Sequence, residues 1–271
     1  MTQKMLEKAR TLAFNYSISS SYKINNKIKA SNFIIQPSWI LLQKSIPISV
    51  EEKLFTIASA TSKKLDHILL NEKSSYKQTG AMFNKENVYI EDIAKVYFYQ
   101  LQNELKQMEK DKDLVKLFSV QVQRGFVDKA TYFFDNKCII STAGSFSAVH
   151  RHYNSDLSDE QNKQLYKKCS VDHGHEYEIR IFLKKTLAKN NDNKFFELSL
   201  LKSILEKKIL KHFHGKYLND LVGNTSGEIL AKHCYNQIKP ALGNTDLAVE
   251  LNETRKNSFF YPVDFYNCSN F

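Results

Sequence analysis

The sequence has few of the residues that interrupt or cross-link a chain, with 8 glycines, 4 prolines and 4 cysteines among 271 residues. Four scattered cysteines do not make the disulfide framework of a small secreted protein, so we expect reduced thiols. No stretch approaches the roughly 20 apolar residues of a membrane span, and the start, MTQKMLEKAR, lacks the apolar core of a signal peptide. These absences predict a cytoplasmic protein without a membrane partner.

The charge is unbalanced, with 39 Lys and Arg residues against 29 Asp and Glu residues and a net charge of +10. The lysines are spread along the whole chain and do not form the dense block typical of nucleic-acid binding. The excess therefore indicates either an anionic ligand or a solvated lysine-rich surface, and we expect no nucleic-acid partner. A hydrophobic share of 42% and a charged share of 25% are typical of a folded globular protein.

Hydrophobic periodicity divides the chain into two similar halves. In the first half, apolar residues at helical spacing predict helices over 49–70 and 90–108, and LFSVQVQ and KATYFFD predict two short strands. Two opening strands fit loosely over 10–24 and 30–43. In the second half the same patterns predict strands over 137–149, 173–184, 246–252 and 258–266, with helices over 195–212 and 226–239. Both halves have the order strand, strand, helix, helix, strand, strand.

The two halves also align residue by residue, as an internal repeat should. The matching segments are LDHILLNE (65–72) with FHGKYLND (213–220), NVYIEDIA (87–94) with NTSGEILA (224–231), and SVQVQRG (119–125) with AVELNET (248–254). The predicted fold class is α+β, with two tandem domains over 1–135 and 136–271. Each would be an antiparallel sheet with its helices on one face.

A histidine cluster is the strongest chemical signal. Residues two apart on a strand point the same way, so His173 and His175 project from one face, and pairing with the preceding strand brings His150 to them. Three histidines with an open fourth position are the ligand set of a catalytic zinc. His152 lies on the same face and is a competing ligand. The remaining histidines His212, His214 and His233 are interpreted as ordinary surface or core residues.

Cys169 lies four residues before His173. Two roles are open to its thiol: a fourth ligand, which would close the site as a structural zinc, or a base and nucleophile tuned by the cation. Sequence spacing does not separate the two roles.

The motifs FSAVHRH, Cys-x-x-x-His-Gly-His (169–175) and NETRKNSFFY (252–261) together resemble the 6-pyruvoyl-tetrahydropterin synthase and 6-carboxy-tetrahydropterin synthase family. That family has the tunnelling fold, whose strand-strand-helix-helix-strand-strand units assemble into barrels. The resemblance is good over 137–266 and weak over the first half. It implies a homo-oligomer, because the sheet edges of one unit are closed by joining further units.

The resemblance also assigns roles. It implies that His150, His173 and His175 are the zinc ligands, that Cys169 is the general base, and that Glu253 anchors the pterin ring. Zinc would polarise the side-chain hydroxyls of the substrate and lower their pKa, while a carboxylate can accept two hydrogen bonds from the guanidine-like edge of a pterin.

Each half departs from the family pattern in a different way. The family has a Leu-Asp-His motif before its second helix, whose Asp and His complete proton transfer across a subunit interface. The second half has Phe213, His214 and Gly215 there, whereas the first half keeps Asp66 and His67 but lacks the zinc histidines and the cysteine. Arg124 also replaces the anchoring Glu in the first half. This pattern predicts a site shared between the two domains.

The three-residue gap between Cys169 and His173 resembles the 6-carboxy-tetrahydropterin synthases. The expected reaction is therefore conversion of 7,8-dihydroneopterin triphosphate to 6-carboxy-5,6,7,8-tetrahydropterin, a lyase reaction on the route to queuosine. Two alternatives stay open: triphosphate elimination of the 6-pyruvoyl-tetrahydropterin synthase type, and a non-catalytic pterin-binding or zinc-binding homologue.

Overall fold

The computed structural model describes residues 10–43, 46–72, 83, 86–108, 111, 113–186 and 198–266. The chain divides into two compact units, which we call unit 1 and unit 2. Unit 1 consists of Met1–Ile140 with Thr186–Asn193 and Ser269–Phe271, and unit 2 of Ser141–Lys185 and Lys194–Cys268. The division falls after Ile140, inside a strand, and not at Asp135 as the sequence predicts.

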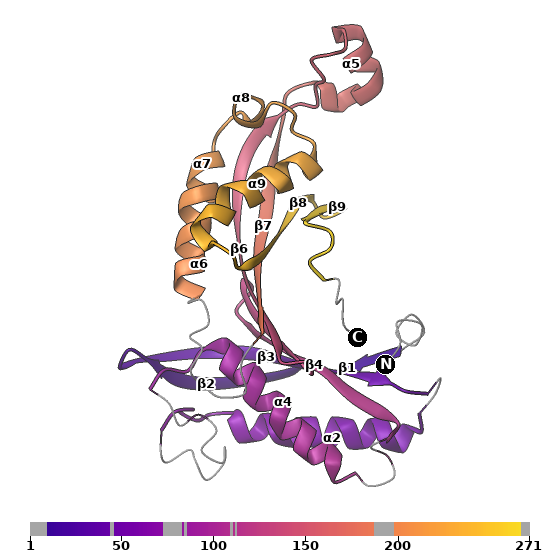
Figure 1. Cartoon of the computed structure of the whole chain (residues 1–271), viewed down its shortest axis with the longest axis vertical. Helices are drawn as coiled ribbons and strands as arrows, with labels where there is room; N and C mark the ends of the chain where they lie inside the picture. Colours follow the sequence, from indigo (N-terminus) through magenta and orange to yellow (C-terminus); the bar gives the residue numbers. More distant parts are fainter. Residues whose placement is uncertain are drawn as a thin grey trace. The chain divides into compact units, whose positions relative to one another are not determined.

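Unit 1 is an antiparallel sheet with two helices against it (Figure 1). Its elements are β1 (Arg10–Ala13), β2 (Tyr16–Ile24), β3 (Lys27–Leu41), α2 (Ile48–Leu65), α4 (Ile90–Lys106), β4 (Val115–Arg124) and β5 (Asp128–Phe133). One edge of the long strand β3 pairs with β2 and β1, and its other edge pairs with β4, which pairs with β5. Both helices pack on the sheet and on each other, and bury Leu54, Leu65, Tyr97 and Leu101.

The first helix of unit 1 is shorter than the sequence predicts, ending at Leu65 and not at residue 70. Beyond it the backbone turns onto β2: His67 has a positive φ of 55°, and its N–H donates to the Ser19 carbonyl. These contacts with the strand replace the hydrogen bonds that another helical turn would make. Asp66 and His67 therefore lie on a turn, and not on the amphipathic helix that the apolar spacing indicates.

Unit 2 also ends in helices followed by two strands, but two strands precede those helices, where unit 1 has three. Its elements are β6 (Lys137–His150, mostly in this unit), α5 (Asp159–Tyr166), a short 3-10 turn (Lys167–Ser170), β7 (His173–Thr186), α6 (Leu198–Leu205), a π-helical turn (Glu206–Leu210), α7 (Lys211–Phe213), α8 (Leu218–Val222), α9 (Gly227–Leu242), β8 (Asp246–Thr254) and β9 (Asn257–Tyr261). β6 neighbours β7, and β7, β8 and β9 pair antiparallel in turn. The predicted helix over 195–212 corresponds to α6, the π turn and α7, although 195–197 lie outside the described residues.

In unit 2, α9 packs on β8 and β9, and α6 packs on α9 (Figure 1). α9 approaches β9 closely at Gly227, where a Cβ atom would overlap the Phe259 ring, so this contact requires glycine. β9 ends at Tyr261, short of the predicted residue 266, because Pro262 has no N–H to donate to a ladder. Both units thus have the predicted α+β architecture of an antiparallel sheet covered by helices.

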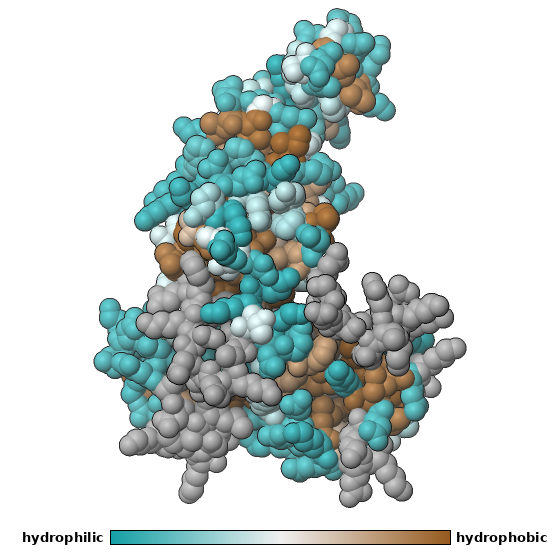
Figure 2. Space-filling view, in the orientation of Figure 1, coloured by the Kyte–Doolittle hydropathy of each residue, from teal (hydrophilic) through white to brown (hydrophobic). Residues whose placement is uncertain are grey.

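The loop between β6 and β7 contains α5, which the periodicity does not predict. Buried Asn162 organises this loop, because its amide donates to the Asn154, Leu157 and Ser158 carbonyls and its side-chain oxygen accepts from the Asn154 N–H. The surface of the loop is mainly hydrophilic with a small hydrophobic patch (Figure 2), and Leu165 is exposed there.

Equivalent backbone contacts recur in the two units, at the positions that the sequence alignment pairs. In unit 1 the Ser21 N–H donates to the Ile68 carbonyl at 3.0 Å, and in unit 2 the Val149 N–H donates to the Lys216 carbonyl at 2.9 Å. Each contact belongs to an isolated parallel bridge, Ser21 with Leu69 in unit 1 and Val149 with Tyr217 in unit 2.

A pair of asparagines extends the equivalence. In unit 1 the Asn71 side chain accepts from the Lys23 N–H at 2.8 Å and donates to the Lys23 carbonyl at 3.3 Å. In unit 2 the Asn219 side chain makes the same two bonds with the backbone of Arg151, both at 2.9 Å. The two units therefore share hydrogen bonds that strand order alone does not require.

Candidate metal centre

The histidines lie where strand alternation places them. On β6, Phe146, Ala148 and His150 are buried while the residues between them are exposed, and His150 is 0% exposed. On β7, His173 and His175 continue the face of the buried Tyr177. The prediction that the three histidines share one face of neighbouring strands is confirmed.

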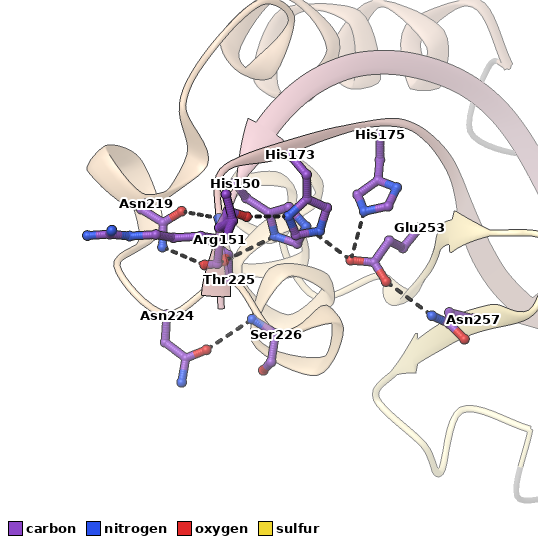
Figure 3. Close-up of polar contacts among 11 residues, drawn as sticks. His150, Arg151, His173, His175, Asn219, Asn224, Thr225, Ser226, Glu253 and Asn257 are labelled. Carbon is purple, nitrogen blue, oxygen red and sulfur yellow. Dashed lines mark hydrogen bonds and ion pairs between the residues drawn. The ribbon is translucent and has the colours of Figure 1, made fainter. Parts of the chain in front are cut away.

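The three imidazoles form a tight cluster (Figure 3). The ring centroid of His150 lies 4.6 Å from that of His173 and 5.2 Å from that of His175, and the last two are 5.0 Å apart. One ring nitrogen from each lies within 4.8 Å of the others. Three convergent nitrogen donors are a suitable ligand set for a metal ion such as zinc.

The second nitrogen of two rings is already engaged. His150 Nδ1 lies 3.2 Å from Thr225 Oγ1, and His173 Nδ1 lies 2.7 Å from the Val171 carbonyl oxygen. A carbonyl oxygen can only accept, so His173 carries its proton on Nδ1 and has a free lone pair on Nε2. Such outer contacts orient metal-ligating histidines.

Burial favours the neutral form of two of the three histidines, His150 and His175. Desolvation, followed by the charge of neighbouring His173, lowers the pKa of His150 to about 4, and desolvation lowers the pKa of His175. Neutral imidazole is the form that coordinates a cation. His150 Nε2 is buried without a hydrogen-bond partner, as is the Tyr177 hydroxyl, whose ring contacts those of His150 and His175. A buried lone pair in this position fits a bound metal ion.

Glu253 lies at the end of β8, beside the histidines, and is 9% exposed. Its Oε1 is 3.3 Å from His150 Nε2 and 3.9 Å from His175 Nε2, while its Oε2 accepts a hydrogen bond from Asn257 at 3.2 Å (Figure 3). His150, His152 and Glu253 also form a group with ligand atoms within 4.8 Å. The structure therefore places His152 where it could serve as an alternative metal ligand, as the sequence predicts.

Cys169 lies on the 3-10 turn that follows α5, and it is partly exposed. Its carbonyl accepts from the His152 N–H at 2.8 Å, which ties this loop to the end of β6. Within the described parts of the chain, its thiol belongs to neither group of clustered ligand atoms. This arrangement gives no support to a role of Cys169 as a fourth ligand.

Asp66 and His67 lie in unit 1, whose described residues contain no histidine cluster. Asp66 Oδ2 is 2.9 Å from His67 Nδ1, and its Oδ1 accepts from the Ser19 N–H at 2.7 Å. The Ser19 N–H and then the His67 side chain hold the pKa of Asp66 below its ordinary value. The His67 side chain is 80% exposed and borders a cavity of about 540 Å³. Serines dominate its lining, with Ser19, Ser20, Ser21 and Ser31.

Unit 1 has different chemistry where unit 2 has its histidine and carboxylate. The repeated contacts make Tyr22 equivalent to His150 and Arg124 equivalent to Glu253. The Arg124 guanidinium donates to the Tyr22 hydroxyl at 2.5 Å and to Asp128 Oδ2 at 2.7 Å. In unit 1, the cation of Arg124, the phenol of Tyr22 and the buried carboxylate of Asp128 lie at the position equivalent to the histidine cluster of unit 2.

Unit 2 in turn lacks an Asp-His pair like that of Asp66 and His67. His214 is equivalent to Asp66, and its Nδ1 accepts from the Ser147 N–H at 3.3 Å. Gly215 is equivalent to His67, and its N–H donates to the Ser147 carbonyl. The backbone contact of unit 1 is kept in unit 2, and the Asp and His side chains are not. None of His212, His214 and His233 belongs to a ligand cluster of the described residues.

The second half of the chain matches known proteins. The model of the 6-pyruvoyl tetrahydropterin synthase family matches residues 139–263. A 6-pyruvoyl tetrahydrobiopterin synthase of Dictyostelium discoideum is 31% identical over 128 residues, which are 45% of this chain and 94% of that protein. The protein of the same name from Poecilia reticulata is 30% identical over 132 residues, which are 45% of this chain and 88% of that protein. The chain therefore belongs to the 6-pyruvoyl tetrahydropterin synthase family through its second half.

The solved structure of Caenorhabditis elegans 6-pyruvoyl tetrahydropterin synthase is 26% identical, covers 46% of this chain and 94% of that chain, and has a TM-score of 0.40. The family match begins at residue 139, so almost all of unit 1 lies outside it. In the described parts of the chain, no helix has the length and apolar character that a membrane span requires.

Proposed function

We propose that the protein is a zinc-dependent pterin synthase that eliminates triphosphate from 7,8-dihydroneopterin triphosphate, as a 6-pyruvoyl tetrahydropterin synthase does. The observation that carries the proposal is the convergence of His150, His173 and His175 in a chain whose second half belongs to this family. The names of the relatives favour this pyruvoyl-type reaction over the carboxy-type reaction that the sequence alone predicts. The three-residue gap before His173 keeps 6-carboxy-tetrahydropterin formation as the second candidate.

The side chains of unit 2 have complementary roles in this proposal. The three histidines hold zinc, which when bound polarises the hydroxyls of the substrate side chain. Cys169 takes a proton from that side chain. Glu253 accepts hydrogen bonds from the pterin, and its nearly complete burial strengthens them because little water competes.

Proton return requires groups that unit 2 lacks, and we propose that unit 1 is a diverged tandem copy that supplies them. Its Asp66 orients His67 through Nδ1, which leaves Nε2 free, and the ring is exposed enough to reach a substrate. Gly215 and His214 cannot replace this pair, since glycine has no side chain and His214 Nδ1 is bonded to the backbone. The proposal concerns the chemical complementarity of the two units, whether within one chain or between neighbouring chains.

Oligomerisation completes the proposal. In the described residues of unit 2, β9 pairs with β8 alone and leaves a row of backbone groups without a strand partner. Open edges of this kind are closed when further units join into a barrel. Light scattering on the purified protein would test the assembly, and a monomer at micromolar concentration would contradict it.

The test of function combines metal and product analysis. Purified protein should contain about one zinc ion per chain, and incubation with the triphosphate should release inorganic triphosphate and yield the pyruvoyl pterin. A carboxylated pterin with acetaldehyde would establish the second candidate. Bound zinc without any product would show a non-catalytic homologue, and the absence of zinc would overturn the metal site itself.

The shared site has its own test. Cys169→Ala and His67→Ala should each abolish turnover while zinc is retained. If the site forms between chains, mixing the two variants under exchange conditions should restore part of the activity, because one interface then has both intact groups. An active His67→Ala enzyme would overturn the role of unit 1 and leave the zinc site unaffected.

A further inference from the structure

The buried hydroxyl of Thr225 lies between the histidine cluster and the backbone of Arg151, the residue directly after β6. Thr225 is 0% exposed, and its Oγ1 lies 3.2 Å from His150 Nδ1 and 2.8 Å from the Arg151 carbonyl oxygen (Figure 3). Asn219 also donates to that carbonyl. The hydroxyl therefore joins a histidine of the cluster to a fixed point of the backbone.

The number of available protons decides the direction of these bonds. A carbonyl oxygen only accepts, so the single hydroxyl proton of Thr225 is donated to Arg151. Oγ1 must then accept from His150, which requires a proton on Nδ1. A neutral imidazole with a proton on Nδ1 has its lone pair on Nε2. That nitrogen is the buried atom without a hydrogen-bond partner beside Glu253.

Unit 1 provides an internal comparison, because Val88 occupies the position of Thr225 in the alignment. The Lys23 carbonyl, equivalent to that of Arg151, accepts from the Val88 backbone N–H at 3.1 Å, so it has a partner without any hydroxyl. Val88 is also fully buried. A threonine is therefore not needed to satisfy the carbonyl, and it occurs in the unit where a histidine replaces Tyr22.

We propose that Thr225 is a positioning residue that holds His150 in the Nδ1-protonated tautomer and thereby presents Nε2 to the metal ion. The inference rests on the proposed zinc site and deepens it. Loss of such an outer contact lowers metal affinity by roughly 10–100-fold in other proteins.

The test compares Thr225→Val, which keeps the shape but removes the hydroxyl, with Thr225→Ser, which keeps the hydroxyl. Zinc affinity is measured by competition with a chromophoric chelator on the full chain. We expect Thr225→Val to bind zinc about 10–100-fold more weakly than the wild type and Thr225→Ser to bind within about threefold of it. The matched control Val88→Thr adds a hydroxyl in unit 1 and should leave zinc affinity unchanged.

A second readout needs no metal. Two-bond ¹⁵N–¹H correlation spectra of the histidine rings in the metal-free protein should show His150 protonated on Nδ1 in the wild type. A wild-type His150 protonated on Nε2 would overturn the inference even if Thr225→Val failed to fold. Unchanged zinc affinity in Thr225→Val, or an equal loss in Thr225→Ser, would overturn it too. If the wild type binds no zinc, the proposed metal site fails first, which is a different outcome.

Discussion

Units 1 and 2 share a backbone framework and differ in the chemistry that it supports. Asn71 and Asn219 hold equivalent backbone groups with equivalent bonds. One residue before these backbone partners, however, the side chains differ, since unit 2 has the imidazole of His150 where unit 1 has the phenol of Tyr22. The comparison teaches that contacts through the backbone survive changes at the positions whose side chains do the chemistry.

The replacement in unit 1 is internally consistent. Its Arg124 brings a positive charge to the place of a carboxylate, and Asp128, with a side chain 3% exposed, balances that charge at 2.7 Å. A cation held there would oppose a second metal ion by charge repulsion. Unit 1 therefore has an ion pair and a tyrosine at the position where unit 2 has His150 and Glu253.

The largest expected effect is on zinc content, and it should occur in the histidine cluster of unit 2 but not in the Tyr22–Arg124 cluster of unit 1. His173→Ala should reduce the zinc content from about one ion per chain to nearly none, because losing a side chain that binds the metal directly should cost more affinity than the roughly 10–100-fold of an outer contact. Tyr22→Phe in unit 1 should leave zinc content unchanged. Elemental analysis of both variants checks this difference, and zinc loss in Tyr22→Phe would mean that unit 1 also contributes to metal binding.

The next largest effect is expected in unit 1 and not in unit 2, and it concerns the rate of turnover. His67→Ala should abolish measurable turnover, because removing a general acid or base lowers kcat by about 10²–10⁴-fold. His214→Ala, at the unit 2 position equivalent to Asp66, should leave kcat unchanged, because its Nδ1 accepts from the Ser147 N–H and its ring belongs to no ligand cluster of the described residues. Steady-state kinetics of both variants at equal zinc content provide the measurement, and equal losses would contradict the division of roles.

A smaller effect concerns stability. Arg124→Ala should destabilise unit 1 by about 3–5 kcal/mol, because the buried Asp128 carboxylate loses its guanidinium. In metal-free protein, Glu253→Gln should change stability much less, since the amide keeps the shape and can still accept from Asn257. Urea unfolding followed by tryptophan fluorescence reports on unit 1, where the single tryptophan Trp39 is buried. An unchanged midpoint in Arg124→Ala would show that the ion pair is dispensable.

The smallest effect should be the same in both units. Asn71→Ala and Asn219→Ala each remove two hydrogen bonds to one backbone residue, at an expected cost of about 1–3 kcal/mol. Amide hydrogen exchange near each substitution measures the cost locally. A loss of protection in one unit only would show that the shared framework matters to that unit alone.

Sequence periodicity predicted most of the fold, because apolar alternation and helical spacing survive in both halves. The order of elements and the shared face of His150, His173 and His175 could be predicted, since a strand orients its side chains with a period of two. α5 could not, because this helix of eight residues buries only the polar Asn162 and has no apolar stripe. The end of α2 at Leu65 was also missed, because bonds to β2 override the local apolar spacing.

The sequence by itself determined the ligand types, their spacing and the missing Asp-His pair of unit 2. Only the tertiary structure decided which ring nitrogen faces the cluster, because the tautomer of His150 depends on Thr225, 75 residues away along the chain. It also decided the hydrogen-bond partner of Arg124, because the Tyr22 hydroxyl that it contacts is 102 residues away along the chain. Such contacts arise when separate strands and loops fold together, and they leave no periodic pattern in the sequence.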